Sequence, residues 1–430
     1  MDNCFYIYAD YIYYNNNVEE KKYLLVENGL IKGLFNTNSN NNIKTYFRKN
    51  SAIFPSFINT HTHLPMVYFR GLADDLQLHD WLKKHIWPNE NKWLSSEFVY
   101  DATLLSLCEL IHAGTTTVND MYFYSEKIAE AINIAKLNGV IGVGVLDFPT
   151  KFAKNTTAYL NNAKKLMDMF KNFNNIKIAI CPHSLYTVCP ESFKKCLEFS
   201  VKYNLLLHTH LAESIWEIEN IQKQYNKRPV EILNNIGIFD IPSIFAHSVY
   251  LNDNEILLLG KKHTNIAHCL ESNLKLASGF SPIKKLLDAG CNITIATDGA
   301  ASNNDMDMIG EISSVAKIHK ALNLDATLIN ANDAFQMATA NAAKALNFNN
   351  KGILKENYSA DFFVISFNKA HATPLYNIMS HLVYSAKSSD ITDLFNNGIP
   401  IMLDNKIVTL DEEVIIEKSN WWGKKIKSSS

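Results

Sequence analysis

Two histidines, His61 and His63, stand two residues apart in the stretch Asn-Thr-His-Thr-His. If this stretch is a β-strand, both imidazoles point to the same face of the sheet. Imidazole nitrogen is a common zinc ligand, but two histidines leave a zinc ion short of its usual four ligands. We therefore expect further ligands elsewhere in the chain.

A second His-x-His pair and an aspartate can supply those ligands. His208 and His210 share one face of a predicted strand, so either of them could bind a metal, and the position nearer the strand end favours His210. Asp298 follows another apolar run, in Ala-Thr-Asp-Gly. Three imidazoles and a carboxylate suit zinc and leave room for water. We predict that His61, His63, His210 and Asp298 bind one divalent ion per chain, Zn²⁺ being the best fit.

The elements that must position these residues are short strands alternating with helical patterns, which is typical of βα units around a parallel sheet. Eight strands are predicted, at residues 53–63, 115–121, 140–148, 176–183, 205–211, 244–249, 265–269 and 292–298. Eight such units close a (β/α)8 TIM-like barrel, whose active site lies at the C-terminal ends of the strands. The predicted ligands fall at the ends of strands one, five and eight.

The two chain ends have a different pattern. Residues 1–52 and 352–430 contain short strand-like runs with Asn and Gly between them, at 6–12, 362–366, 399–403 and 406–410. We predict that they form one small β-sandwich domain together, and that residues 53–351 form the barrel.

Three further histidines end predicted strands. His183 follows strand four and His247 follows strand six, so both can face a substrate, whereas His268 near strand seven suits a structural role equally well. Some zinc barrels bridge two metals with a modified lysine at the end of strand four. Here Lys177 lies near the start of that strand, so a single metal is expected.

Composition points to small-molecule chemistry. The 41 basic and 43 acidic side chains are mixed along the chain and give a net charge of −2, so no footprint for nucleic acid is visible. The chain contains no run of about 18 apolar residues and no signal-like start, so we expect a cytoplasmic protein without a membrane partner. The seven scattered cysteines form no CxxC pair and are expected to be free and apolar. A homo-oligomer is compatible with the sequence.

The sequence resembles the 5'-methylthioadenosine/S-adenosylhomocysteine deaminases of the amidohydrolase superfamily along nearly its whole length. The resemblance is carried by residues 55–66, 70–76, 81–90, 182–184, 210–213, 272–276 and 297–304. His-x-His alone marks only the superfamily. The stretches 81–90 and 298–304 narrow the likeness to this deaminase group and its close relatives.

The resemblance implies roles for residues beyond the predicted ligands. Glu213 would be the proton shuttle, His247 a partner of the hydroxide, and Glu90, His183 and Trp81 the nucleoside contacts. The implied reaction is hydrolytic deamination of an adenosine-type nucleoside to the inosine analogue and ammonia by a metal-bound hydroxide. Candidate substrates are 5'-methylthioadenosine, S-adenosylhomocysteine, 5'-deoxyadenosine and adenosine.

The chemistry follows from charge and position. Zinc lowers the pKa of bound water toward about 7, so a hydroxide can attack carbon 6 of the purine at neutral pH. Asp298 can take its proton, and Glu213 can deliver a proton to ring nitrogen 1 and pass another to the departing ammonia. His247 can stabilise the developing tetrahedral centre. These three residues are the predicted catalytic set.

One segment departs from the family pattern. The end of strand three and the following loop commonly supply arginines for a substrate carboxylate, but residues 143–154 read VGVLDFPTKFAK. Lys151 and Lys154 are point charges without the bidentate fork of arginine. We therefore expect S-adenosylhomocysteine to be no better a substrate than the smaller nucleosides.

Other functions are compatible with the same motifs. A guanine deaminase, an aminofutalosine deaminase or a triazine-type hydrolase would use the same metal-assisted attack. A more remote alternative is a barrel without catalysis that serves as an assembly protein. Metal analysis and activity measurements separate these alternatives.

Overall fold

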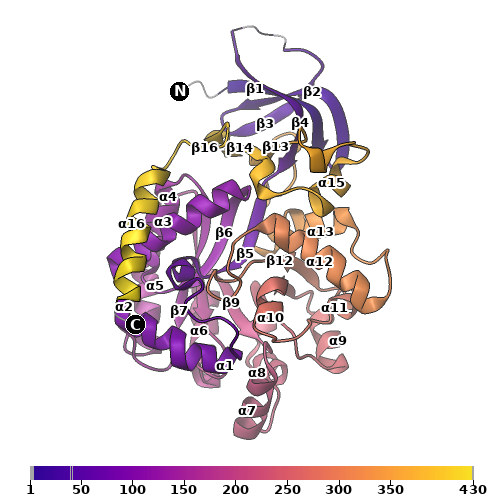
Figure 1. The fold of residues 1–430 in the computed structure, drawn as a ribbon. Coiled ribbons are helices and arrows are strands. Elements are labelled where there is room, and N and C mark those ends of the chain that lie inside the picture. The colour runs from indigo at the N-terminus through magenta and orange to yellow at the C-terminus, as the bar shows by residue number, and fades with distance from the viewer. Residues whose placement is uncertain (1–3, 39, 41, 429–430) are drawn as a thin grey trace.

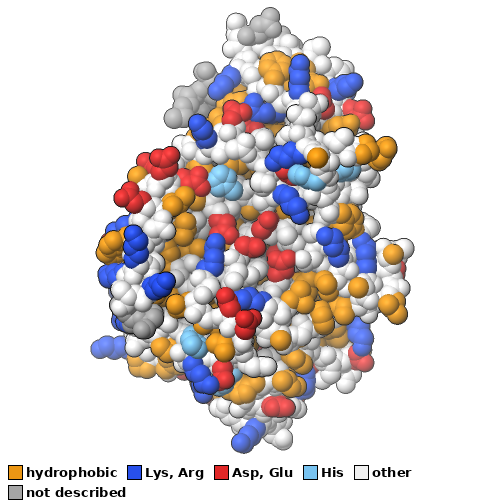
Figure 2. Space-filling model, viewed as in Figure 1, with side chains coloured by type: hydrophobic (Ala, Val, Ile, Leu, Met, Phe, Trp, Pro, Cys, Tyr) orange, Lys and Arg blue, Asp and Glu red, His pale blue; other side chains and the backbone are white. Residues whose placement is uncertain are grey.

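The computed structural model describes residues 4–38, 40 and 42–428. Its two parts, a barrel surrounded by helices and a smaller sheet at one end of it, are joined by a strand that runs from the sheet into the barrel (Figure 1). Side chains of both charge signs are interspersed on the face drawn in Figure 2. None of the helices within the described ranges is both long enough and apolar enough to cross a membrane.

Eight parallel strands form the barrel in consecutive order, which confirms the predicted fold class. They are β5 (Phe57–Thr62), β6 (Thr115–Tyr122), β7 (Asn138–Val145), β8 (Ile176–Pro182), β9 (Leu206–Leu211), β10 (Ser243–His247), β11 (Asn265–His268) and β12 (Asn292–Ile295). The first and last strands meet through the Thr60 and Thr294 hydroxyls, 2.8 Å apart, and through the amide of Asp298, which donates to the carbonyl of His61 at 3.1 Å.

The helices around the barrel bury their apolar faces against its strands or against one another. They are α3 (Ser96–His112), α4 (Ser125–Ile134), α5 (Thr156–Phe170), α6 (Pro190–Tyr203), α7 (Ile215–Tyr225), α8 (Pro229–Ile236), α9 (Asp253–Lys261), α10 (Leu270–Lys275), α11 (Ile283–Ala289), α12 (Met308–Asn323), α13 (Ala331–Met337) and α14 (Ala340–Ala345). Helix α8 ends at Gly237, whose φ of +93° is the left-handed conformation that glycine adopts at helix ends.

The chain between β5 and α3 folds over the C-terminal ends of the strands. It contains η1 (Leu64–Phe69), α1 (Leu78–Trp81), a π-helical turn η2 (Leu82–Ile86) and α2 (Trp87–Trp93). π-Helical turns are rare and are frequent at functional sites. This turn lies between the two predicted nucleoside contacts Trp81 and Glu90.

Both chain ends build the second sheet, as predicted. It runs in the order β16 (Lys406–Ile407), β15 (Ile399–Leu403), β14 (Ile391–Asn396), β13 (Phe362–Ser366), β4 (Lys44–Pro55), β1 (Cys4–Tyr14), β2 (Asn17–Glu27) and β3 (Leu30–Phe35). Phe5 of β1 and Phe395 of β14 are three strands apart, yet their ring centroids lie 5.3 Å apart. The sheet therefore folds over on itself around its own apolar core, as in a sandwich.

The strand and domain pattern differs from the sequence expectation in several places. Some strands end earlier than predicted, such as β12 at Ile295 instead of residue 298, and two larger differences concern the architecture. The single strand expected at 53–63 is two strands, β4 and β5, divided at Ser56, where the chain leaves one sheet for the other. Within 352–430, α15 (Ile378–Tyr384) and α16 (Glu412–Lys427) pack on barrel helices instead of joining the sheet. The division at residues 52 and 352 stays a prediction.

Candidate metal and nucleoside site

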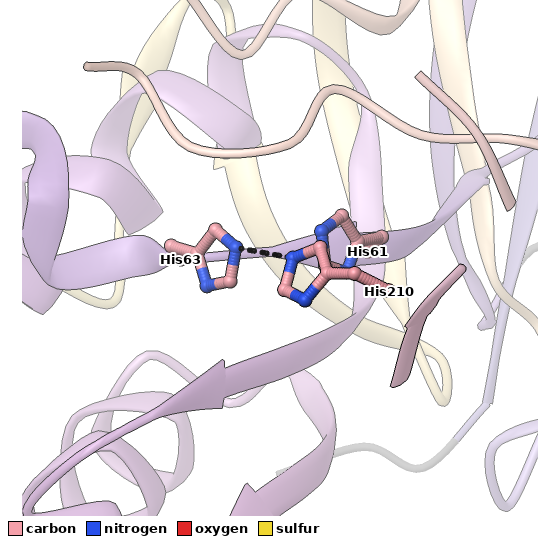
Figure 3. Close-up of side chains that lie close together, drawn as sticks. All are labelled: His61, His63 and His210. Atoms are coloured by element: carbon pink, nitrogen blue, oxygen red, sulfur yellow. Dashed lines mark hydrogen bonds between the residues drawn. The ribbon is translucent and has the colours of Figure 1, made fainter. Parts of the chain in front are cut away.

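Three histidines converge at the C-terminal end of the barrel (Figure 3). His61 belongs to β5, His63 follows it directly, and His210 belongs to β9; each offers a ring nitrogen, and these nitrogens lie within 4.8 Å of one another. The Nδ1–H groups of His63 and His210 donate to the carbonyls of Met121 (2.6 Å) and His183 (2.8 Å). Their Nε2 lone pairs consequently face each other at 3.3 Å, an arrangement that suits a shared cation.

Asp298 faces the same point. Its Oδ1 atom is 3.4 Å from Nε2 of His61 and 3.3 Å from Nε2 of His63. Its Oδ2 atom accepts hydrogen bonds from the Ser272 and Ser302 hydroxyls, both at 2.7 Å. Burial raises its pKa, but the contacts with the histidines outweigh burial and hold the pKa of Asp298 well below its usual range. The carboxylate is therefore available as an anionic ligand.

The environment of Nε2 of His61 tests whether these residues suit a metal ion. This nitrogen is buried and has no hydrogen-bond partner among the described residues. Burial lowers the pKa of His61 to about 4, so the ring is neutral near pH 7. A neutral imidazole nitrogen, two further imidazoles and a carboxylate form a donor set that fits a divalent metal ion.

His208 lies behind His61 and holds its ring. Nε2 of His208 is 2.9 Å from Nδ1 of His61, and the side-chain amide of Asn119 donates to Nδ1 of His208 at 3.1 Å. The sequence left His208 and His210 as alternatives. The structure places the His210 ring beside His63 and His61, where the candidate metal ligands converge, whereas His208 contacts only His61 of these three rings.

Glu213 and His247 complete the polar side of the site. Nε2 of His247 is 3.9 Å from a carboxylate oxygen of Glu213, and Nδ1 of His247 is 2.8 Å from the side-chain oxygen of Asn273. Burial lowers the pKa of His247, but the charges of Glu213 and Asp298 outweigh it and raise the pKa. His247 and Asp298 also have φ of 68° and 63°, conformations that non-glycine residues seldom adopt and that cluster at functional sites.

A cavity of about 390 Å³ opens from these residues and contains the predicted nucleoside contacts Trp81, Glu90 and His183 on its walls. Its volume is within the range of small-molecule sites. The Tyr122 hydroxyl donates to the Glu90 carboxylate at 2.6 Å, and burial raises the pKa of Glu90 to about 7. Nδ1 of His183 is 2.8 Å from the Thr187 hydroxyl.

Other sequence candidates lie away from this point. His268 faces His319 with its Nε2 atom 2.8 Å from that of the partner ring, inside the protein. Lys177 donates to the carbonyls of Leu346 and Asn347, at the opposite end of strand β8 from the histidines. Lys151 lines the cavity, whereas Lys154 does not.

Sequence reasoning assigned no role to several residues that shape the site. Asn273, Ser272 and Ser302 bond directly to the candidate catalytic side chains His247 and Asp298, and Tyr122 bonds to the predicted nucleoside contact Glu90. Three of them, Ser272, Asn273 and Ser302, lie within the stretches that carried the family resemblance. Their position in these stretches was the sequence feature that could have indicated a role in the site. Tyr122 ends strand β6, where a polar residue faces the barrel mouth.

The sequence profile of the Amidohydrolase family matches residues 52–400. The chain belongs to the amidohydrolase family. This result confirms the amidohydrolase superfamily and the hydrolase class expected from the sequence. The family match covers the barrel and extends into the C-terminal strands of the second sheet.

Individual amidohydrolases resemble the chain over their full length. A 5-methylthioadenosine/S-adenosylhomocysteine deaminase of Thermodesulfovibrio yellowstonii is 41% identical over 100% of both chains. A 5'-deoxyadenosine deaminase of Methanocaldococcus jannaschii is 42% identical over 86% of this chain and 88% of the relative. A solved structure of an adenosine deaminase from Xanthomonas campestris with bound zinc superposes with a TM-score of 0.95 at 32% identity, covering 99% of this chain and 98% of that chain.

Proposed function

We propose that this amidohydrolase removes the 6-amino group of adenosine-type nucleosides by hydrolysis, giving the inosine analogue and ammonia. The observation that carries the proposal is the convergence of His61, His63, His210 and Asp298 beside a cavity that Glu213 also lines. Relatives named for deamination of 5-methylthioadenosine, 5'-deoxyadenosine and adenosine support the same reaction.

One Zn²⁺ ion per chain is the proposed cofactor. His61, His63 and His210 would hold it through ring nitrogens, and Asp298 through its carboxylate. A bound zinc ion supplies Lewis-acid activation of water at neutral pH. Lys177 is bonded at the other end of its strand, which favours a single ion over a lysine-bridged pair.

The chain's own residues would handle the protons and the substrate. The Asp298 carboxylate accepts a proton from the attacking water, and Glu213 donates its proton to ring nitrogen 1 of the purine. Glu213 then takes the proton of the hydroxyl added at carbon 6 and passes it to the leaving amine, and the proton held by Asp298 finally returns to Glu213. Burial raises the pKa of Glu213 above that of an ordinary glutamate, which favours its proton-carrying form. His247 donates a hydrogen bond to the oxygen added at carbon 6. Glu90, His183 and Trp81 hold the nucleoside.

The loop after β7 has lysines where an arginine could bind the carboxylate of S-adenosylhomocysteine, so this nucleoside is not expected to be the preferred substrate. No arginine lines the cavity within the described parts of the chain, and Lys151 is the non-histidine cation there. A lysine recovers only part of a bidentate arginine–carboxylate contact and loses more of it to salt. Adenosine and its small 5'-substituted analogues are therefore expected to react at least as efficiently as S-adenosylhomocysteine.

The proposal is tested by measuring ammonia release from purified, zinc-loaded protein. Adenosine, 5'-deoxyadenosine, 5'-methylthioadenosine, S-adenosylhomocysteine, guanosine and guanine are compared in one buffer at one salt concentration. Release from the adenosine nucleosides alone supports the proposal. Release from guanine, or from none of these compounds, contradicts it.

A further inference from the structure

The turn between strand β9 and helix α7 carries Glu213 and is held by one buried carboxylate. The two side-chain oxygens of Glu217 accept hydrogen bonds from two consecutive backbone amides, that of Ala212 at 3.1 Å and that of Glu213 at 2.9 Å. Glu217 is 1% exposed. Ala212 has a φ of 51°, in the left-handed region that non-glycine residues seldom adopt. The Glu217 carboxylate therefore stabilises an unfavourable backbone conformation directly before Glu213.

The carbonyl side of this turn is bound to the segment that follows His247. The carbonyl of Ala212 accepts hydrogen bonds from the amides of Val249 at 3.0 Å and of Tyr250 at 2.8 Å. Nε2 of His247 lies 3.9 Å from a carboxylate oxygen of Glu213. The turn is thus held through its amides and through its carbonyl, and the distance between these two polar side chains depends on its conformation.

Glu217 itself is not placed to meet a substrate. It is the third residue of α7, its own amide donates to the Ser214 hydroxyl at 3.2 Å, and it is not one of the described residues that line the cavity. Each of its side-chain oxygens already accepts a backbone amide. Glu217 is therefore suited to hold Glu213 in place and not to transfer protons to a nucleoside.

We propose that Glu217 is a positioning residue for the hydrolysis: by binding two amides of the turn, it directs the Glu213 carboxyl group toward His247. This inference rests on the proposed function, in which Glu213 transfers the protons. Glu217→Gln keeps the shape of the side chain but replaces one acceptor oxygen with an NH2 group, which cannot accept a hydrogen bond. One amide of the turn then loses its partner inside the protein, and Glu213 is displaced.

The test is a double-mutant cycle of Glu217→Gln and Glu213→Gln, measured as ammonia release from adenosine by the purified, zinc-loaded protein. Because misplacement of a catalytic group by about 1 Å can cost about 10²-fold in rate, Glu217→Gln is expected to lower kcat by about 10- to 100-fold. The metal-to-protein ratio should stay at the wild-type value, and the dissociation constant of inosine should change less than about threefold. In the Glu213→Gln background the same substitution should lower kcat less than about twofold, since the group that it displaces has already been removed.

Asp390→Asn is the matched control for a purely structural role. Asp390 is also 1% exposed and accepts a backbone amide, that of Lys387 at 2.9 Å, but it directly precedes strand β14 of the terminal sheet. This variant should lower the melting temperature and leave kcat unchanged in both backgrounds. Glu217→Asp is the second test variant: it keeps the charge, but its shorter side chain cannot reach both amides, so it should lose kcat as Glu217→Gln does.

The outcomes separate this inference from the proposed function. If the wild type releases ammonia but Glu217→Gln lowers kcat equally in both backgrounds, or keeps a near-normal kcat, the positioning role is overturned and the deaminase proposal stands. Loss of metal from Glu217→Gln in proportion to its loss of kcat overturns the positioning role in the same way. If neither Glu217 variant folds, Glu217 serves stability instead, and the inference is again overturned. No ammonia from the wild type overturns the deaminase proposal and this inference with it.

Discussion

The protonation of two ring nitrogens, Nε2 of His63 and of His210, determines whether the site can bind a cation. Backbone carbonyls accept the Nδ1–H groups of His63 and His210, which leaves both Nε2 atoms free of protons. Burial lowers the pKa of both rings, so they stay neutral at pH 7. Two neutral nitrogens facing each other at 3.3 Å repel unless a cation lies between them. The backbone around the histidines, and not only their side chains, therefore shapes the proposed metal site.

The role of Glu213 can be tested with an isosteric change. Glu213→Gln keeps the shape of the side chain but removes the proton it donates and accepts, so kcat should fall by about 10²- to 10⁴-fold. Metal content and nucleoside binding should change much less. The measurements are kcat, the metal-to-protein ratio and the dissociation constant of the inosine-type product.

Glu219→Gln is the matched control, because Glu219 is an exposed residue of the neighbouring helix α7. This variant should retain wild-type turnover. A near-normal kcat in Glu213→Gln would show that Glu213 does not transfer the proton and only positions the substrate.

At the scale of elements, the start of helix α7 carries a buried carboxyl group that responds to pH. Glu217 accepts hydrogen bonds from the amides of Ala212 and Glu213, at 3.1 and 2.9 Å. Burial nevertheless raises its pKa to about 7 from an ordinary 4.5. Between these values the folded protein holds a proton that the unfolded chain has released, so the free energy of unfolding falls as pH rises through this window.

Glu217→Gln should flatten this part of the pH dependence. Between pH 5 and pH 8 the wild type is expected to lose on the order of 2–3 kcal/mol more stability than the variant. The measurement is the melting temperature of both proteins across that range, since other titrating groups contribute equally to both. Parallel curves would show that Glu217 is ionised throughout.

Helix α16 packs on the barrel helix α3, and Trp422 makes the main buried contact between them. Trp422 is 3% exposed, packs edge-on against Phe98 at 5.2 Å and donates from its indole nitrogen to Asp101 at 2.8 Å. Trp422→Ala should cost about 3–5 kcal/mol because it leaves a large cavity and removes the indole hydrogen bond to Asp101. Trp421→Ala is the control: Trp421 is 47% exposed, so its loss should cost about 1 kcal/mol. Equal melting temperatures for the two variants would contradict this packing.

The sequence predicted elements whose signal is local. The alternation of strand-like and helical patterns predicted the eight barrel strands. The His-x-His spacing and the positions at strand ends predicted His61, His63, His210 and Asp298 as metal ligands. Long-range packing was not visible: nothing near Trp422 indicates that α16 docks on α3, because that contact joins residues more than 300 positions apart. The break at Ser56 was also missed, since both β4 and β5 are apolar there and the hydrophobic pattern continues across it.

At the scale of the whole molecule, the terminal sheet and the candidate site occupy opposite ends of the barrel. Gly114, just before β6, touches Phe363 and Ile391 of the terminal sheet so closely that a Cβ atom would lie 2.8 Å from Ile391. Asn138, at the start of β7, bonds to Asn396 of the same sheet at 2.6 Å. The sheet therefore covers the N-terminal ends of the strands, a face associated with stability, and leaves the C-terminal ends free for chemistry.

The proposed metal ligands come from the first, fifth and last strands of the barrel, so one ion would link the two strands at which the barrel closes. Metal that binds only the folded state stabilises it by about 4 kcal/mol when the free metal is 1,000-fold above its dissociation constant. Chelation should therefore lower the melting temperature, and one equivalent of Zn²⁺ per chain should restore it. His61→Ala should bind little metal and show no response to chelator, whereas exposed His263→Ala should behave as wild type. Two tightly bound ions per chain, or full metal occupancy in His61→Ala, would contradict the single four-ligand site.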